Sequence, residues 1–292
     1  MYVMTFNLTP TAGLTFRILP GSILDIATYP FVPPTTLSGF LRRLAMISAG
    51  LEFPNTGPND EYTPFYALPH ELIAVGAYPV GVWTRPVHRT YRKGPRDLGH
   101  TAFSALYRGK SRGPENIQLH TWEYLLGEKF TGYVVSKSYE DLTRLGGLIG
   151  YGAKLGKEGY AFVESIAGPF ELEHTEIRAN PSTVIPADEL FRKIPQVPAD
   201  IYTLYSFEWR SPNADRGQPR QPRSRKKATG PEQIYSGDPF DQYPSPIVGY
   251  KPFVAAQLGP NVSVTLDFLH HGELFIPAAL IDLLQGELSN EA

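Results

Sequence analysis

The chain of 292 residues contains no cysteine, and this absence excludes several kinds of chemistry at once. There is no disulfide framework, no thiol nucleophile, and no zinc or iron–sulfur site with cysteine ligands. The sequence also lacks any apolar stretch of about 18 residues, and no signal-like apolar run follows a basic N-terminus. We therefore expect a cytoplasmic protein with no membrane partner.

The chain also has few long segments without proline or glycine. The 28 prolines and 27 glycines make up about 19% of the chain, against a usual share of roughly 12%. This excess favours many turns and long ordered loops, and it argues against a helical bundle. The hydrophobic share of 42% is ordinary for a soluble globular protein with a buried core.

Acidic residues are nearly absent from two segments that are rich in lysine and arginine. Residues 85–112 carry eight Lys/Arg against the single acid Asp97, and residues 216–227 carry six with no acid. The formal net charge of −2 therefore hides an otherwise acidic body. Such segregation favours a polyanionic partner, and nucleic acid is the partner we expect.

The first half of the chain predicts alternating strands and helices. Strands are predicted over residues 2–8, 14–18, 71–78, 117–126, 130–135 and 160–164. A helix is predicted from Thr35 or Thr36, as N-cap, to near Gly50, and a shorter one over 139–145, capped by Ser138. Residues 146–159 form a glycine-rich loop.

The order β, α, β, insertion, β, α, glycine loop, β predicts an α+β, ferredoxin-like domain over residues 1–168. Its basic insertion covers about residues 84–115, between the second and third strands. Residues 169–292 predict a mostly β portion with strands over 170–178, 201–209, 246–257 and 262–269 and a helix over 278–284. The second basic segment, about 211–231, is rich in Pro, Gly, Arg and Gln and predicts a long loop.

The glycine-rich loop suggests a site for phosphate groups. Dense glycine leaves backbone N–H groups accessible as anion donors, and Lys154 and Lys157 add positive charge. The loop does not end in the Gly-Lys-Ser/Thr of a Walker A motif, and it precedes a strand rather than the helix of a Rossmann fingerprint. The alternative is an ordinary helix-to-strand turn that needs positive φ.

The first basic segment interleaves cations with the aromatic residues Trp83, Tyr91, Phe103 and Tyr107. Cations neutralise phosphates while aromatic rings stack on unpaired bases, which is typical of single-strand binding. A solvated loop without a partner is the alternative. The second segment is weaker evidence, because a flexible basic loop also binds duplex or protein non-specifically.

Catalysis is the less favoured interpretation. None of the seven histidines has metal-ligand spacing, so neither a metal nor a cofactor is predicted. The nearest approach to a ribonuclease site is His88 or His100 with Lys93, in which histidine would move a proton and lysine would stabilise the phosphorane.

Two short motifs resemble CRISPR-associated RAMP proteins. Residues 33–43, Pro-Pro-Thr-Thr-Leu-Ser-Gly-Phe-Leu-Arg-Arg, resemble the first helix of that family, and residues 150–160, Gly-Tyr-Gly-Ala-Lys-Leu-Gly-Lys-Glu-Gly-Tyr, its glycine-rich loop and following strand. The insertion resembles the thumb of the subunit that binds the 5′ handle of CRISPR RNA in Cascade-type complexes. Residues 130–164 are most similar to the type I-D form of that subunit.

The resemblance implies a non-catalytic scaffold that caps the 5′ handle of the CRISPR RNA and contacts the large subunit and the backbone subunit in antiviral defence. The adjacent Lys-His pair of nucleolytic relatives is missing. Two alternatives stay open: a metal-independent endoribonuclease that processes precursor RNA, and a protein-interaction module with an acidic partner.

The predicted RNA-binding residues lie in the insertion, the first helix and the glycine-rich loop: Arg85, His88, Arg89, Tyr91, Arg92, Lys93, Arg96, Arg108, Lys110, Arg112, Arg42, Arg43, Gly150, Gly152, Lys154 and Lys157. The second segment offers a contact to target DNA near the PAM through Arg220, Arg223, Arg225, Lys226 and Lys227.

Overall fold

Antiparallel strands dominate the structure, a computed structural model that describes residues 1–18, 25–50, 67–93, 117–157, 159–210, 247–286 and 288–289. The fold is mixed α+β, as the sequence predicts. The strands are β1 (Tyr2–Pro10), β2 (Asp25–Ile26), β3 (Ile73–Thr84), β4 (Val87–Lys93), β5 (Ile117–Glu123), β6 (Leu126–Ser136), β7 (Gly152–Leu155), β8 (Gly159–Glu171), β9 (Glu173–Ala179), β10 (Ile185–Pro186), β11 (Ala199–Arg210), β12 (Ile247–Leu258), β13 (Val264–His271), β14 (Leu274–Pro277) and β15 (Leu288–Ser289). The helices are α1 (Pro34–Ser48), α3 (Tyr139–Thr143), the 3₁₀ turn η2 (Arg144–Leu148), α4 (Ala187–Lys193) and α6 (Ala278–Gln285).

A five-stranded sheet with the order β3-β6-β1-β8-β7 organises the first half of the chain. Its neighbouring strands all pair antiparallel. The chain passes through β1, α1, β3, β6, α3 and β8 in turn, so β1 lies between two strands that come later. This element order agrees with the one predicted for residues 2–166, except that the predicted glycine-rich loop contains the strand β7.

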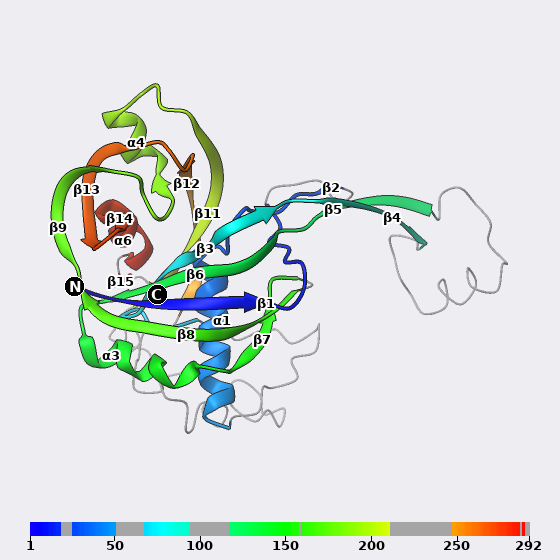
Figure 1. Ribbon diagram of the computed structural model, residues 1–292, viewed down its shortest axis with the longest axis horizontal. Helices are drawn as coiled ribbons and strands as arrows, with labels where there is room; N and C mark the ends of the chain where they lie inside the picture. The colour runs from blue at the N-terminus through cyan, green and yellow to red at the C-terminus, as the bar shows by residue number, and fades with distance from the viewer. Residues whose placement is uncertain are drawn as a thin grey trace, which may run out of the picture.

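Helix α1 packs on one face of this sheet and supplies much of the core. Leu37, Leu41 and Leu44 are fully buried, as their helical spacing predicts. The approach is close, because a Cβ added at Gly132 of β6 would lie 3.2 Å from Leu37. Figure 1 shows α1 crossing behind β1 and β8.

The predicted start of this helix was wrong. Its N-cap is Pro33 and not a threonine, and no side chain caps the first turn. The carbonyl of Pro33 accepts the first intrahelical bond from the N–H of Leu37 at 2.9 Å. Proline fits the first helical position, here Pro34, because the N–H that it lacks would have no partner inside the helix.

Residues 14–18 do not form the predicted strand. Leu14 and Arg17 instead make isolated bridges, to Leu125 and Thr28. The extended segment therefore crosses between the sheet and the strands of the insertion and joins neither ladder. Alternation of apolar residues predicts an extended backbone, but it does not say whether that backbone finds a long pairing partner.

The second half is mostly β, as predicted, and forms two smaller sheets with the orders β10-β12-β11-β15 and β14-β13-β9. The predicted strands over 201–209, 246–257 and 262–269 correspond to β11, β12 and β13, and the predicted helix to α6. The strand predicted to begin at residue 170 begins at Glu173, because β8 continues to Glu171. Helix α4 was not predicted, although acids in its first turn and bases in its last suit the helix dipole.

Buried side chains from both halves form one continuous cluster. It joins Phe6 and Leu41 to Leu204, Leu280 and Ile281, on the other side of the proposed boundary at residue 168. The division into two domains stays a prediction. Within the described residues, no helix is long and apolar enough to cross a membrane.

Candidate nucleic-acid interface

The predicted insertion leaves the sheet as part of a two-stranded arm, formed by β4 and β5. The arm extends past residue 115, because most of the strand predicted over 117–126 pairs with β4 as β5 and not with the five-stranded sheet. The two strands pair antiparallel from Val87↔Glu123 to Lys93↔Ile117. Figure 1 shows the arm extending away from the sheet, at the end opposite to β9 and β13. Arg85, His88 and Arg89 are exposed at its start. Basic side chains thus lie on a projecting ribbon, where an extended polyanion can reach them.

Eight of the residues predicted in the insertion have side chains outside the described part of the structure. Tyr91, Arg92 and Lys93 belong to β4, but their side chains are not among those described. The predicted residues of the insertion that lie outside the described part of the chain are Arg96, His100, Arg108, Lys110 and Arg112.

A carboxylate anchors the base of the arm. Glu123, at the end of β5, accepts a hydrogen bond from the backbone N–H of Thr28 at 2.9 Å, and its other oxygen lies 3.8 Å from the Arg85 guanidinium. Its backbone carbonyl accepts a hydrogen bond from the Thr15 hydroxyl at 3.2 Å. Three segments that are distant in sequence are therefore tied at one residue.

The glycine-rich loop folds as a turn, a short strand and a hairpin. After η2, the strand β7 pairs with the start of β8, from Gly152↔Phe162 to Leu155↔Gly159. Gly156, in the hairpin turn, has φ of 73°, and a Cβ there would lie 2.7 Å from the carbonyl oxygen of Thr15. Glycine is needed here for its backbone conformation and for close approach, which supports the turn alternative for this position.

The hairpin turn contacts the base of the arm. The backbone N–H of Lys157 donates to the Thr15 carbonyl at 3.0 Å, and the Lys157 ammonium lies 3.9 Å from the centre of the Trp122 ring. Trp122, in β5, is only 2% exposed, so the ammonium covers an otherwise buried ring. A cation within about 6 Å of an indole face is attracted by the ring quadrupole. The glycine-rich segment thus meets the strand that follows the first basic segment and pairs with its start.

The other predicted residues of the first half divide into exposed and buried positions. Lys154 on β7 is exposed, and Gly150 precedes that strand with φ of 81°. Of the two arginines on α1, Arg43 is exposed but Arg42 is only 7% exposed. A guanidinium buried in this way is not available to a ligand on the surface.

The predicted DNA-binding residues of the second basic segment lie outside the described part of the chain. Within the described residues, no group of three or more His, Asp or Glu side chains is arranged to hold a metal ion.

Comparison with known proteins adds little. No family model matches the chain, and no curated protein matches it either. Among solved structures, a chain of the type III-B Cmr-beta complex, determined by cryo-EM with cognate target RNA and AMPPnP bound, is similar with a TM-score of 0.37 and 12% sequence identity. The similarity covers 88% of this chain and 84% of that chain. At this TM-score the likeness is remote, and we base the functional proposal on the chain's own residues.

Sequence reasoning missed two residues that the geometry brings forward. Glu123 falls within the strand predicted over 117–126, and nothing in the sequence indicates that Thr28 lies beside it. Tyr160 was assigned only to a strand. Tyr160 follows Gly159 directly and lies six residues after Lys154. Since residues that flank a short hairpin turn face each other, this spacing could have indicated that Tyr160 and Lys154 are cross-strand neighbours.

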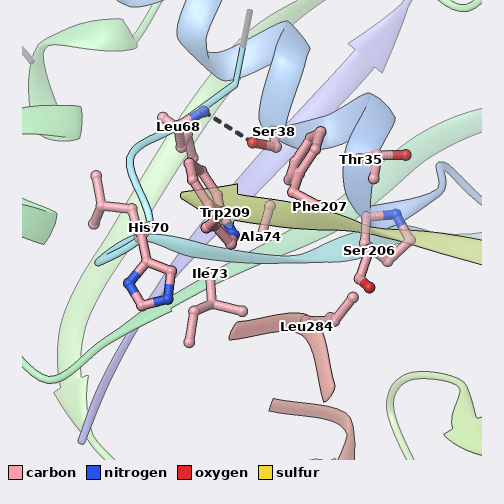
Figure 2. A pocket seen from close by; sticks show the side chains of 12 residues that line it. Thr35, Ser38, Leu68, His70, Ile73, Ala74, Ser206, Phe207, Trp209 and Leu284 are labelled. Atoms are coloured by element: carbon pink, nitrogen blue, oxygen red, sulfur yellow. Dashed lines mark hydrogen bonds between the residues drawn. The ribbon is translucent and has the colours of Figure 1, made fainter. Parts of the chain in front are cut away.

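A separate cavity lies away from the arm, between the start of α1, the start of β3, the end of β11 and α6 (Figure 2). Its lining includes Thr35, His70, Trp209 and Leu284. Ser38 also lines it and accepts a hydrogen bond from the Leu68 N–H at 2.9 Å, drawn in Figure 2. None of the predicted binding residues lines this cavity, so we place the candidate interface at the arm and the hairpin.

Proposed function

We propose that this chain is an RNA-binding subunit of a CRISPR ribonucleoprotein complex. The observation that carries the proposal is the contact between Lys157 and Trp122, which joins the glycine-rich hairpin to the base of the arm. An RNA strand held along the arm therefore has a second group of donors and cations directly beside it. Phosphate contacts from several separate elements are what fixes a nucleic acid in register.

The strand order supports the proposal. A central β1 between β6 and β8, with β3 on the far side of β6, is consistent with a ferredoxin-like domain, the topology that RNA-recognition modules also use. The described start of the arm carries exposed Arg85 and Arg89, and the rest of the insertion is basic in sequence.

The finer assignment rests on the sequence motifs. We propose that the subunit caps the 5′ handle of the CRISPR RNA in a Cascade-type complex of the type I-D form, in the cytoplasm, with the large and backbone subunits as neighbours. The role is binding without cleavage, because the adjacent Lys-His pair of nucleolytic relatives is missing from this sequence.

The test is binding of a labelled single-stranded repeat RNA at several salt concentrations. Each phosphate contact on a single strand contributes about 0.7 to the slope of log K against log salt. Replacing Arg89, Arg92 and Lys93 together with alanine should therefore weaken binding strongly and lower the magnitude of this slope by about two.

A charge-matched variant separates the arm from general electrostatics. Lys137, Arg178 and Arg192 are exposed and lie outside the arm, and their joint replacement with alanine removes the same charge. This control should bind almost as the wild type does. Equal losses in the two variants would reject the arm as the RNA site. Metal-independent cleavage of the RNA that disappears in a His88→Ala or His100→Ala variant would favour the endoribonuclease instead.

A further inference from the structure

The five-stranded sheet has a second face, opposite to α1, which we call the outer face. Side chains alternate between the two faces, so Phe6 and Leu8 point to the core while Asn7 and Thr9 point outward. Asn7 joins the strands across this face: its amide donates to the Ser165 hydroxyl at 2.9 Å and accepts from the Thr131 hydroxyl at 3.2 Å. The outer face is polar and internally hydrogen-bonded near its centre.

The two sides of the outer face differ in how they are covered. On the β3 side, the Tyr78 hydroxyl accepts a hydrogen bond from the Val184 N–H at 3.1 Å, so the second half of the chain packs there. On the β7 side, Lys154 and Tyr160 are exposed. They form a cross-strand pair, and their neighbours Ala153, Leu155 and Ala161 face the core.

Tyr160 is the largest exposed side chain on this part of the face. It is 46% exposed, and within the described residues its side chain has neither a hydrogen-bond nor a ring partner. An exposed aromatic ring offers a flat surface on which a base can stack. Its exposure is not explained by packing within the described chain.

Gly152 provides the surface on which the Tyr160 ring rests. A Cβ added at Gly152 would lie 2.8 Å from Cε1 of Tyr160, closer than the two atoms can approach. The ring therefore lies against bare backbone on one side, which holds it in place. Tyr160 is still exposed on this face, and Lys154, its cross-strand partner on β7, is exposed as well.

We propose that Tyr160 stacks on an unpaired base of the bound RNA while Lys154 contacts an adjoining phosphate. This inference rests on the proposed function and extends its site from the hairpin turn to the outer face. The path is continuous, because the turn that joins β7 to β8 carries Lys157, which contacts the base of the arm. Stacking on an aromatic ring does not depend on the identity of the base, since every base has a π face.

The experiment measures the affinity of fluorescein-labelled single-stranded repeat RNA by anisotropy. Tyr160→Ala should weaken binding by about fivefold to a hundredfold, the range found for loss of one stacked base. Tyr160→Phe keeps the ring and should bind as the wild type does. Tyr139, on α3, is 47% exposed and provides the matched control, so Tyr139→Ala should leave affinity unchanged.

A second variant moves the ring without removing it. Gly152→Ala places a methyl group 2.8 Å from Cε1 of Tyr160 and 3.0 Å from the Ala161 carbonyl oxygen and from Cβ of Phe162. It should therefore displace the ring and weaken binding, and the part of the loss that is due to the ring should be absent in a Tyr160→Ala background. Thermal unfolding of each variant verifies that it is folded.

The outcomes separate the two proposals. RNA binding by the wild type with no change in Tyr160→Ala would overturn the stacking role and leave the arm proposal intact. Absence of RNA binding by the wild type would overturn both. Equal losses in Tyr160→Phe and Tyr160→Ala would also overturn stacking, because the hydroxyl and not the ring would then be responsible.

Discussion

Replacing Glu123 with alanine should loosen the base of the arm. The substitution removes the acceptor of the Thr28 N–H, and Thr28 is fully buried, so water cannot take the place of the carboxylate. A hydrogen bond to a charged group contributes about 1.5–3 kcal/mol, and the ion pair with Arg85, at 3.8 Å and partly exposed, adds at most about 1 kcal/mol. We expect the free energy of unfolding to fall by about 2–3 kcal/mol.

Two measurements check this value. Urea denaturation gives the free energy, and the midpoint of thermal unfolding should fall by about 3–5 °C. Amide exchange of β5 should accelerate more than that of β1, because the lost contact lies at the arm. Glu123→Gln keeps an acceptor oxygen and should lose less.

Glu128 on β6 provides the control for Glu123. It is exposed, so Glu128→Ala should stay within about 0.5 kcal/mol of the wild type. The reasoning is refuted if Glu123→Ala unfolds like this control and β5 exchanges at the wild-type rate.

Two further predictions concern the hairpin and the sheet. Gly156→Ala should destabilise the chain by at least about 2 kcal/mol, because it combines positive φ with a Cβ 2.7 Å from the Thr15 carbonyl oxygen. Gly146 has open space around it, so Gly146→Ala should change stability little. Equal effects of the two substitutions in urea denaturation would contradict the geometry. Burial raises the pKa of Tyr133 from 10.0 to about 12, so its neutral form stabilises the folded state fully below pH 10 and this contribution is lost as the pH rises to about 12. Tyr133→Phe should make the decline in stability over this range shallower, and an unchanged decline would refute the assignment.

Local patterns in the sequence predicted most of the elements. Leu37, Leu41 and Leu44 marked the buried stripe of α1, and Ser138 caps α3 by accepting from the Asp141 N–H at 3.2 Å, as expected. These signals are contained within one element. The start of α1 was not predicted correctly, because no side chain caps its first turn and the sequence therefore shows no capping residue there. Pro34 suits the first helical position, since it has no backbone N–H that would need a partner.

The candidate site depends on contacts between distant segments, and these could be predicted only in part. The sequence indicated that the arm and the glycine-rich segment are each suited to phosphate groups. It could not indicate that Lys157 meets Trp122, because the turn between β7 and β8 approaches β5 through residues 14–16, and the strand predicted there joins no ladder in the structure. The burial of Arg42 likewise follows from how α1 is rotated about its axis against the sheet. Because Arg42 lies beside the apolar stripe of the helix, the spacing of the apolar residues does not determine whether it is buried or exposed.

The most direct test of the account is to isolate the chain from its native host and sequence the RNA that copurifies with it. We predict CRISPR RNA that retains its 5′ handle, recovered with the wild type and lost when Arg89, Arg92 and Lys93 are replaced with alanine. Recovery of the same RNA with that variant, or a wild-type chain that copurifies with protein alone, would contradict the account.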